Sequence, residues 1–202
     1  MPCELPGRGT RLGEPAVSDM GSLVRLMAEG LEPLIDLPYA ILGISMGALA
    51  GFELSRTLRS LHYQQPAALL AVAQNAPSAA LERPPASLMS DEKLRAAPHR
   101  HGGMSEEALG NPRLMRLFLP VLRADYSIVD TYSYRIEKPL HCPIDLFVGT
   151  NDPSISSNGI QGWQQETFAN ATMHHFAGNH FFFRNNQRLF LAAVSSRLRE
   201  LV

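Results

Sequence analysis

Short apolar segments alternate with helix-like segments along most of the chain. Four apolar runs have the length of buried strands and are bounded by proline, glycine or polar residues. They are residues 37–42, 67–73, 143–149 and 172–176. Four other segments have the spacing of amphipathic helices, namely 18–33, 48–59, 160–168 and 186–201. This alternation predicts an α/β fold with a mostly parallel sheet flanked by helices.

The alternation stops after Asn75. Residues 76–85 are rich in proline, and residues 90–134 carry helix-start signals at Ser90, Ser105 and Asn111 in place of strands. A helical insert between two strands of an α/β sheet is typical of a lid, although such helices can also simply cover the sheet. We expect an α/β-hydrolase core at 1–75 and 136–202 and a helical lid insertion at 76–135.

Ser45 lies in the sequence Gly43-Ile44-Ser45-Met46-Gly47, between a predicted strand and a predicted helix. A serine on such a turn is a nucleophile elbow, in which a strained backbone exposes the hydroxyl. Gly43 and Gly47 would allow strand and helix to approach closely. The N-terminus of the helix would also direct backbone N–H groups at a developing oxyanion. The alternative is a glycine–serine turn in which Ser45 only caps the helix.

His180 is the candidate general base among seven histidines. It follows the predicted strand at 172–176 in a loop, where an imidazole can reach a serine at a neighbouring strand end. His174 and His175 lie inside that strand, so we expect packing or surface roles for them. The alternative for His180 is a loop histidine that caps the following helix.

Asp152 is the candidate acid, because it follows the predicted strand at 143–149 and precedes His180. Hydrolases with an elbow serine carry their residues in the order serine, acid, histidine. Some hydrolases of this type take their acid one strand earlier, but here that strand ends in Gln74-Asn75 without a carboxylate, which favours Asp152. The alternative is an ordinary Asp-Pro turn residue. In the predicted triad Ser45 attacks, His180 transfers the proton and Asp152 orients the imidazole.

The composition narrows the classes of function. The 202 residues, 45% of them hydrophobic, suit one domain with a sizeable core. A net charge of −1 gives no support for nucleic acid or an anionic membrane surface as a partner. No apolar run approaches the ~18 residues needed to span a bilayer, and no signal peptide is visible. Cys3 and Cys142 form neither a disulfide framework nor a metal motif. We expect a cytoplasmic monomer.

Further motifs extend over essentially the whole chain. They include Leu5-Pro6-Gly7-Arg8 with Arg11, Pro38-Tyr39, Leu122-Arg123-Ala124-Asp125-Tyr126, Tyr132-Ser133-Tyr134, Cys142-Pro143-Ile144 and Gly178-Asn179-His180-Phe181-Phe182. Together with the elbow they resemble the type II thioesterases, stand-alone α/β-hydrolases that serve nonribosomal peptide and polyketide synthases. The resemblance assigns nucleophile, acid and base to Ser45, Asp152 and His180, in agreement with the order of residues.

This resemblance implies hydrolysis of acyl thioesters on the phosphopantetheine arm of acyl or peptidyl carrier protein domains. Such enzymes remove misprimed or stalled acyl groups from an assembly line. They need no metal and no organic cofactor, and their lid governs acyl-chain choice.

Two features depart from the family pattern. Ile44 stands where the family usually has a histidine, which we expect to alter packing only. The family also begins with strands, and with a loop that donates the second oxyanion N–H, ahead of the motif at Leu5. We therefore expect an N-terminally truncated fold in which Met46 N–H is the identifiable oxyanion donor. Loss of one donor would lower the rate by about 10²–10³.

Two alternatives remain open at this level. The chain could be a medium-chain thioesterase acting on acyl carrier protein or acyl-CoA, or a general esterase, because lid residues determine the substrate. It could also be a non-catalytic module that binds carrier proteins without turnover, if the second oxyanion donor is lacking.

Overall fold

The structure is a computed structural model that describes residues 1–79, 85–100 and 106–201. It divides into a helical unit, Met1–Met27 with Ala80–Ser133, and a sheet unit, Ala28–Ala79 with Tyr134–Val202. The core predicted from the sequence included residues 1–27, whereas in the structure these residues belong to the helical unit. The assignment of a lid function stays a prediction.

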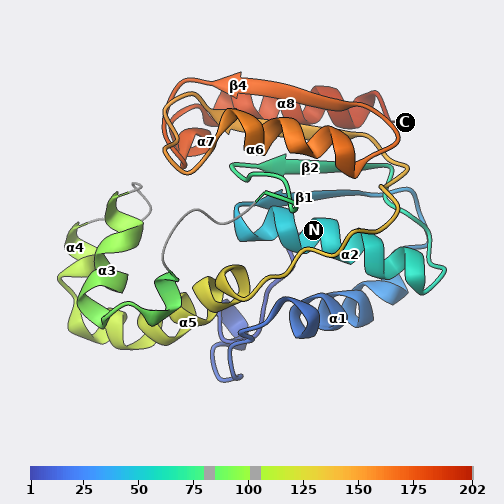
Figure 1. The fold of residues 1–202 in the computed structure, drawn as a ribbon. Coiled ribbons are helices and arrows are strands. Elements are labelled where there is room, and N and C mark those ends of the chain that lie inside the picture. Colours follow the sequence, from blue (N-terminus) through green and yellow to red (C-terminus); the bar gives the residue numbers. More distant parts are fainter. Residues whose placement is uncertain (80–84, 101–105, 202) are drawn as a thin grey trace. The chain divides into compact units, whose positions relative to one another are not determined.

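The sheet unit contains a parallel sheet in the order β1-β2-β3-β4 (Figure 1). Its strands are β1 (Ala40–Ile44), β2 (Ala68–Val72), β3 (Ile144–Gly149) and β4 (Ala171–Phe176). The register pairs Ile44 with Val72 and Gly149 with Phe176, so the strands end at a common edge. The expected parallel sheet flanked by helices is confirmed.

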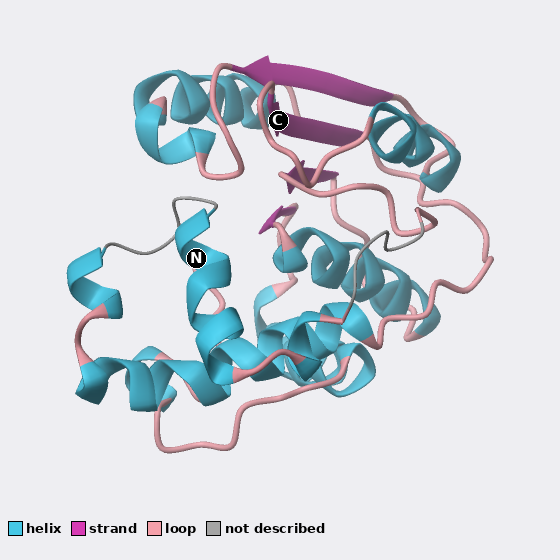
Figure 2. Cartoon of the chain, turned by 60° about the vertical axis from the view of Figure 1, so that its left-hand side comes forward, coloured by secondary structure: helices cyan, strands magenta, loops and turns pink. Residues whose placement is uncertain are grey.

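Helices cover both faces of this sheet, as Figure 2 shows by colour. They are α2 (Met46–Ser60), α6 (Ser157–Gln161), η4 (Gly162–Glu166), α7 (Phe182–Asn185) and α8 (Gln187–Arg199). Alternate residues of β2 point to opposite sides because side chains alternate along a strand. Leu69 packs with Phe52 of α2 and Trp163 of η4. Leu70, on the other face, packs with Phe190 of α8.

The prediction that the strand before Ser45 is buried was wrong in part. It begins at Ala40 instead of Leu37, and Leu42 and Ile44 are 43% and 37% exposed. β1 forms one edge of the described sheet, and the core on the α8 face includes Ala40 as its contribution from β1. Burial of a strand depends on what covers it, which a short apolar run does not reveal.

The helical unit contains helices and no strand among its described residues (Figure 2). Its helices are η1 (Gly9–Arg11), η3 (Ala86–Leu88), α3 (Asp91–Arg100), α4 (Glu106–Leu109) and α5 (Pro112–Asp130). Asn111 caps α5 by accepting hydrogen bonds from two backbone N–H groups, as its sequence signal predicts. The predicted start at Ser105 lies outside the described residues. Leu94, Met115 and Leu119 form the core of this unit.

A further helix, α1 (Met20–Leu31), crosses the division between the units and continues into η2 (Glu32–Leu34). Asp19 Oδ1 accepts a hydrogen bond from Ser22 N–H at 2.8 Å, so Asp19 caps this helix. Among the described helices, none combines the length and apolar character that a bilayer crossing requires.

Candidate active site

Ser45 occupies the turn between β1 and α2 with φ of +53° and ψ of −120°. A positive φ is strained for a residue with a side chain, and such strain is typical of a nucleophile elbow. The turn is held from β2, because Ser45 N–H donates to Val72 O at 2.7 Å. Ala73, which directly follows β2, also has a positive φ, so strained backbone gathers at this edge.

Gly43 makes the elbow sterically possible. A Cβ at this position would lie 2.1 Å from Gly47 O and 2.6 Å from Ala48 N, so any side chain would push the helix off the strand. A Cβ on Gly47 would meet no described atom within 4 Å. The sequence expectation of close approach therefore holds for Gly43, whereas Gly47 contributes its backbone to the contact.

Asp152 and His180 form a hydrogen-bonded pair at the ends of β3 and β4. His180 Nδ1 lies 2.7 Å from Asp152 Oδ2, and the Asp152 side chain is fully buried. Burial acts to raise the pKa of Asp152, but hydrogen bonds from His180 and Ser154 outweigh it and hold this pKa below its ordinary value. The carboxylate is thus kept ionised against the imidazole, as orienting a general base requires.

Backbone contacts fix the two loops that carry this pair. Thr150 N–H donates to Phe176 O at 2.9 Å, and Asn151 N–H donates to Gly178 O at 2.9 Å. The end of β3 lies so close to the histidine loop that a Cβ on Gly149 would be 2.4 Å from Asn179 O. Backbone hydrogen bonds and close packing therefore join the acid turn to the histidine loop.

The parallel register brings the three predicted residues to one edge of the sheet. Ser45 follows β1, Asp152 follows β3 and His180 follows β4, and parallel strands all end on the same side. Met46 is the first residue of α2. The catalytic roles of these four residues, including the oxyanion role of Met46 N–H, stay predictions.

The histidines set aside on sequence grounds have other surroundings. The ring of His174 stacks on Phe147 with centroids 4.6 Å apart, and its neighbour His175 is exposed. The expected packing and surface roles are confirmed. In the part of the chain that the structure describes, no group of His, Cys, Asp and Glu side chains is arranged to hold a metal ion.

Sequence reasoning missed Ser154 and Asn75. The Ser154 hydroxyl donates to Asp152 Oδ1 at 2.6 Å, and Asn75 Nδ2 donates to Ser154 O at 2.9 Å. A serine two residues after an aspartate is a common turn pattern and was the available signal. Nothing local in the sequence pairs Asn75 with a loop 79 residues away.

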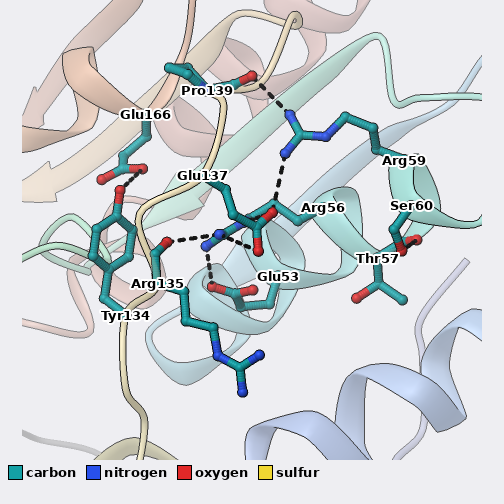
Figure 3. Close-up of polar contacts among 10 residues, drawn as sticks. All are labelled: Glu53, Arg56, Thr57, Arg59, Ser60, Tyr134, Arg135, Glu137, Pro139 and Glu166. Carbon is teal, nitrogen blue, oxygen red and sulfur yellow. Dashed lines mark hydrogen bonds and ion pairs between the residues drawn. The ribbon is translucent and has the colours of Figure 1, made fainter.

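Helix α2, which carries the elbow at its N-terminus, is anchored further along by Arg56 (Figure 3). The Arg56 side chain is 4% exposed, and its guanidinium forms ion pairs with Glu53 at 3.0 Å and Glu137 at 2.7 Å. It also donates to Arg135 O at 2.8 Å. These contacts join the segment that leads into β3 to helix α2.

Comparison with known proteins places these features in a family. The thioesterase domain family matches residues 1–199. The gramicidin S biosynthesis protein GrsT of Aneurinibacillus migulanus is 32% identical over 196 residues, which cover 97% of this chain and 77% of that protein.

Solved structures agree with this match. The type II thioesterase BorB from the borrelidin biosynthetic cluster has a TM-score of 0.87 and 32% identity, over 96% of this chain and 79% of its own. ClbQ from the colibactin NRPS/PKS pathway has a TM-score of 0.92 and 26% identity, over 99% of this chain and 85% of its own. The expected α/β-hydrolase type of fold is therefore confirmed. The chain belongs to the thioesterase domain family, is similar in sequence and fold to type II thioesterases of biosynthetic clusters, and is an enzyme that hydrolyses acyl thioesters.

Proposed function

We propose that this thioesterase removes acyl groups from the phosphopantetheine arm of carrier protein domains in a nonribosomal peptide or polyketide synthase. Ser45 is the nucleophile, His180 the general base and Asp152 the orienting acid. The observation that carries the proposal is the 2.7 Å Asp152–His180 hydrogen bond at the strand edge that also bears the strained Ser45 elbow. Family membership and similarity to thioesterases of biosynthetic clusters supply the substrate class.

In the first step His180 Nε2 takes the proton of Ser45 as its oxygen attacks the thioester carbonyl. The resulting oxyanion lies at the N-terminus of α2, where Met46 N–H donates to it. When the intermediate collapses, the carbon–sulfur bond breaks, the acyl group stays on Ser45 and the pantetheine leaves as its thiol with the proton from His180.

In the second step water replaces the thiol. His180 takes a proton from water, hydroxide adds to the acyl–serine carbonyl, and collapse returns that proton to the oxygen of Ser45. The products are a free carboxylic acid and a carrier arm with its thiol restored. No electrons are transferred, so the reaction consumes only water and requires no redox cofactor.

The proposed partners follow from this substrate. The enzyme meets an acyl or peptidyl carrier protein in the cytoplasm, acts as a monomer, and does not engage nucleic acid or a membrane. A lid function for the helical unit belongs to the same proposal, with acyl-chain choice as its consequence.

The direct test is hydrolysis of acyl-phosphopantetheinyl carrier protein by the purified chain, followed by mass spectrometry of the carrier. The matched substrates are the same acyl groups on coenzyme A and on an oxygen ester, with Ser45→Ala as the inactive control. Preference for the carrier-bound thioester in kcat/KM supports the proposal. Equal or higher kcat/KM for acyl-CoA or the ester contradicts it and favours a general thioesterase or esterase.

Turnover and serine reactivity separate the remaining alternative. A fluorophosphonate that labels Ser45 in the wild type and not in His180→Ala supports an assembled triad. Binding of carrier protein without labelling or turnover would contradict the proposal and favour a non-catalytic binding module.

A further inference from the structure

Ser154 lies in the acid turn, two residues after Asp152, and touches both members of the predicted dyad. Its hydroxyl is 2.6 Å from Asp152 Oδ1 and 3.2 Å from His180 Nδ1. Its backbone N–H also donates to Asp152 Oδ1, at 2.9 Å. Neither the family match nor the order of catalytic residues assigns a role to this serine.

From these contacts we propose that Ser154 is a positioning residue for the hydrolytic reaction, acting through Asp152 and His180 and never on the substrate. The inference rests on the proposed catalytic roles of that pair. The two oxygens of Asp152 have separate donors: Oδ1 accepts both hydrogen bonds from Ser154, and Oδ2 accepts the hydrogen bond from His180. Occupying Oδ1 prevents rotation of the carboxylate and leaves Oδ2 to fix the imidazole.

The chemistry of the three groups agrees with this division. His180 Nδ1 carries its proton toward Asp152, so that nitrogen is a donor and leaves Nε2 to accept the serine proton. The single hydroxyl proton of Ser154 therefore goes to Asp152, at the shorter of its two distances. A neutral hydroxyl holds the carboxylate without cancelling its charge, which an arginine or lysine at this point would do.

Asn75 supports Ser154 from the neighbouring strand end. Its Nδ2 donates to Ser154 O at 2.9 Å, while its Oδ1 accepts from Ser156 N–H at 3.1 Å. Gly159 packs so tightly on this amide that a Cβ there would lie 2.2 Å from Asn75 Oδ1. Asn75, which follows β2, is not a carboxylate and cannot supply the acid, but it holds the loop that carries Asp152.

The hydroxyl also affects how Asp152 acts on the imidazole. Its hydrogen bond is one of the contacts that lower the pKa of Asp152. Because donation to Oδ1 disperses part of the negative charge, removing the hydroxyl leaves more charge facing His180 and favours the imidazolium. The acid limb of the kcat/KM profile, which reports protonation of the general base, should then move to higher pH.

The experiment compares Ser154→Ala with Ser154→Thr on a small acyl thioester that needs no carrier protein. We expect kcat to fall by about tenfold in Ser154→Ala, with a KM change below about twofold, because orientation is lost and binding is not. The acid limb should move to higher pH. Ser154→Thr keeps the hydroxyl and should recover kcat to within about threefold of the wild type.

Two control variants separate positioning from loop stability. Ser157→Ala removes an exposed hydroxyl from the same segment and should change nothing. Ser156→Ala removes the cap of α6, whose hydroxyl accepts from Gly159 N–H at 3.0 Å, and should lower stability without moving the acid limb. Should Ser154→Ala fail to fold, Ser154→Cys offers a weaker donor and should shift the profile the same way by less.

A spectroscopic readout keeps this test independent of the proposed function. The Nδ1 proton of His180, observed by NMR with 15N-labelled histidine, should shift in Ser154→Ala and return in Ser154→Thr. An unmoved resonance together with an unmoved acid limb overturns the proposal, and so does equal loss in the alanine and threonine variants. Wild-type turnover of the small thioester without turnover of carrier-bound substrate refutes the carrier function alone.

Discussion

The sheet unit contains two aspartate–histidine pairs that look alike by distance and differ in everything around them. Asp152 Oδ2 lies 2.7 Å from His180 Nδ1, and Asp145 Oδ1 lies 2.8 Å from His174 Nε2. Both carboxylates are buried, with side chains 0% and 2% exposed. Both pairs join β3 to β4 or to the loops that follow these strands. A short carboxylate–imidazole distance therefore does not identify a catalytic dyad.

The two pairs differ in what completes them. Asp145 also accepts from Arg197 Nε at 2.6 Å, a cation on α8 whose pKa is raised mainly by this hydrogen bond. His174 uses Nε2 for the carboxylate and lies flat on Phe147, within β4. Asp145 thus connects β3 to β4 through His174 and to α8 through Arg197.

The Asp152–His180 pair uses the other ring nitrogen for its carboxylate. His180 uses Nδ1 for Asp152 and lies in a loop beyond the strand, and in the proposed mechanism its Nε2 accepts the proton of Ser45. Its carboxylate is completed by the neutral hydroxyl of Ser154, not by a cation. The position of the histidine in the chain and the ring nitrogen that faces the carboxylate distinguish the proposed catalytic pair from the structural pair.

Replacing each of the two histidines by alanine should give the largest difference in effect between the pairs. We expect His180→Ala to lower kcat/KM by at least about 10³-fold with little loss of stability, because the general base is removed. His174→Ala should keep kcat/KM within about threefold of the wild type and lower the free energy of unfolding by about 1–2 kcal/mol, because a buried carboxylate loses a donor. Thioester hydrolysis and urea unfolding measure both quantities.

His175→Ala, an exposed neighbour on β4, is the control for the second variant and should change neither quantity. Equal losses of activity at His174, His175 and His180 would mean that strand and loop positions do not separate structural from catalytic histidines in this protein.

Arg197 is the cation that completes the Asp145–His174 pair. Arg197→Met leaves the buried Asp145 carboxylate with one partner fewer, which should lower the free energy of unfolding by about 3 kcal/mol. Protein that remains folded should retain its kcat, since Arg197 contacts Asp145 near the beginning of β3, whereas Asp152 and His180 follow the ends of β3 and β4. Arg199→Met, on the exposed side of the same helix, is the control and should stay within about 0.5 kcal/mol. A selective fall in kcat with unchanged stability would contradict the distinction.

The predicted catalytic pair of this comparison was accessible from the sequence. The elbow glycines, the short apolar runs and the order of serine, aspartate and histidine are local or sequential signals. They led to Ser45, Asp152 and His180, and the structure gathers these residues at one edge because parallel strands end together. Capping signals located helix starts equally well, as Asn111 illustrates.

The structural contacts of Asp145 and Asn75 could not be predicted, because they join segments that are far apart in the chain. Arg197 meets Asp145 across 52 positions, and Asn75 meets Ser154 across 79. The prediction that the strand before Ser45 is buried failed for a related reason. Leu42 and Ile44 are apolar like core residues, but their exposure is decided by which helices cover β1. Periodicity reports the face of an element and not its neighbours.

The smallest expected effect is the pH dependence that Asp152 gives to stability. Hydrogen bonds in the folded state hold the pKa of Asp152 below its unfolded value, which is about 3.9. A lowered carboxyl pKa contributes stability that is fully present above that unfolded value and is lost as pH falls through the folded pKa. The free energy of unfolding of the wild type, minus that of Asp152→Asn, should therefore be largest near pH 7 and decline below about pH 4.

Urea unfolding across this pH range measures the difference, with Asp36→Asn as the control for removing an exposed carboxylate. The substituted amide retains the shape of the side chain, so the decline isolates the charge and its hydrogen bonds from packing. Because the proposed mechanism requires the ionised carboxylate, kcat/KM of Asp152→Asn should be low at every pH, including pH values at which both proteins are equally stable. A difference in stability that grows as pH falls would mean that burial outweighs the hydrogen bonds from His180 and Ser154. Asp152 would then be kept protonated by its surroundings and could not orient the imidazole as a carboxylate.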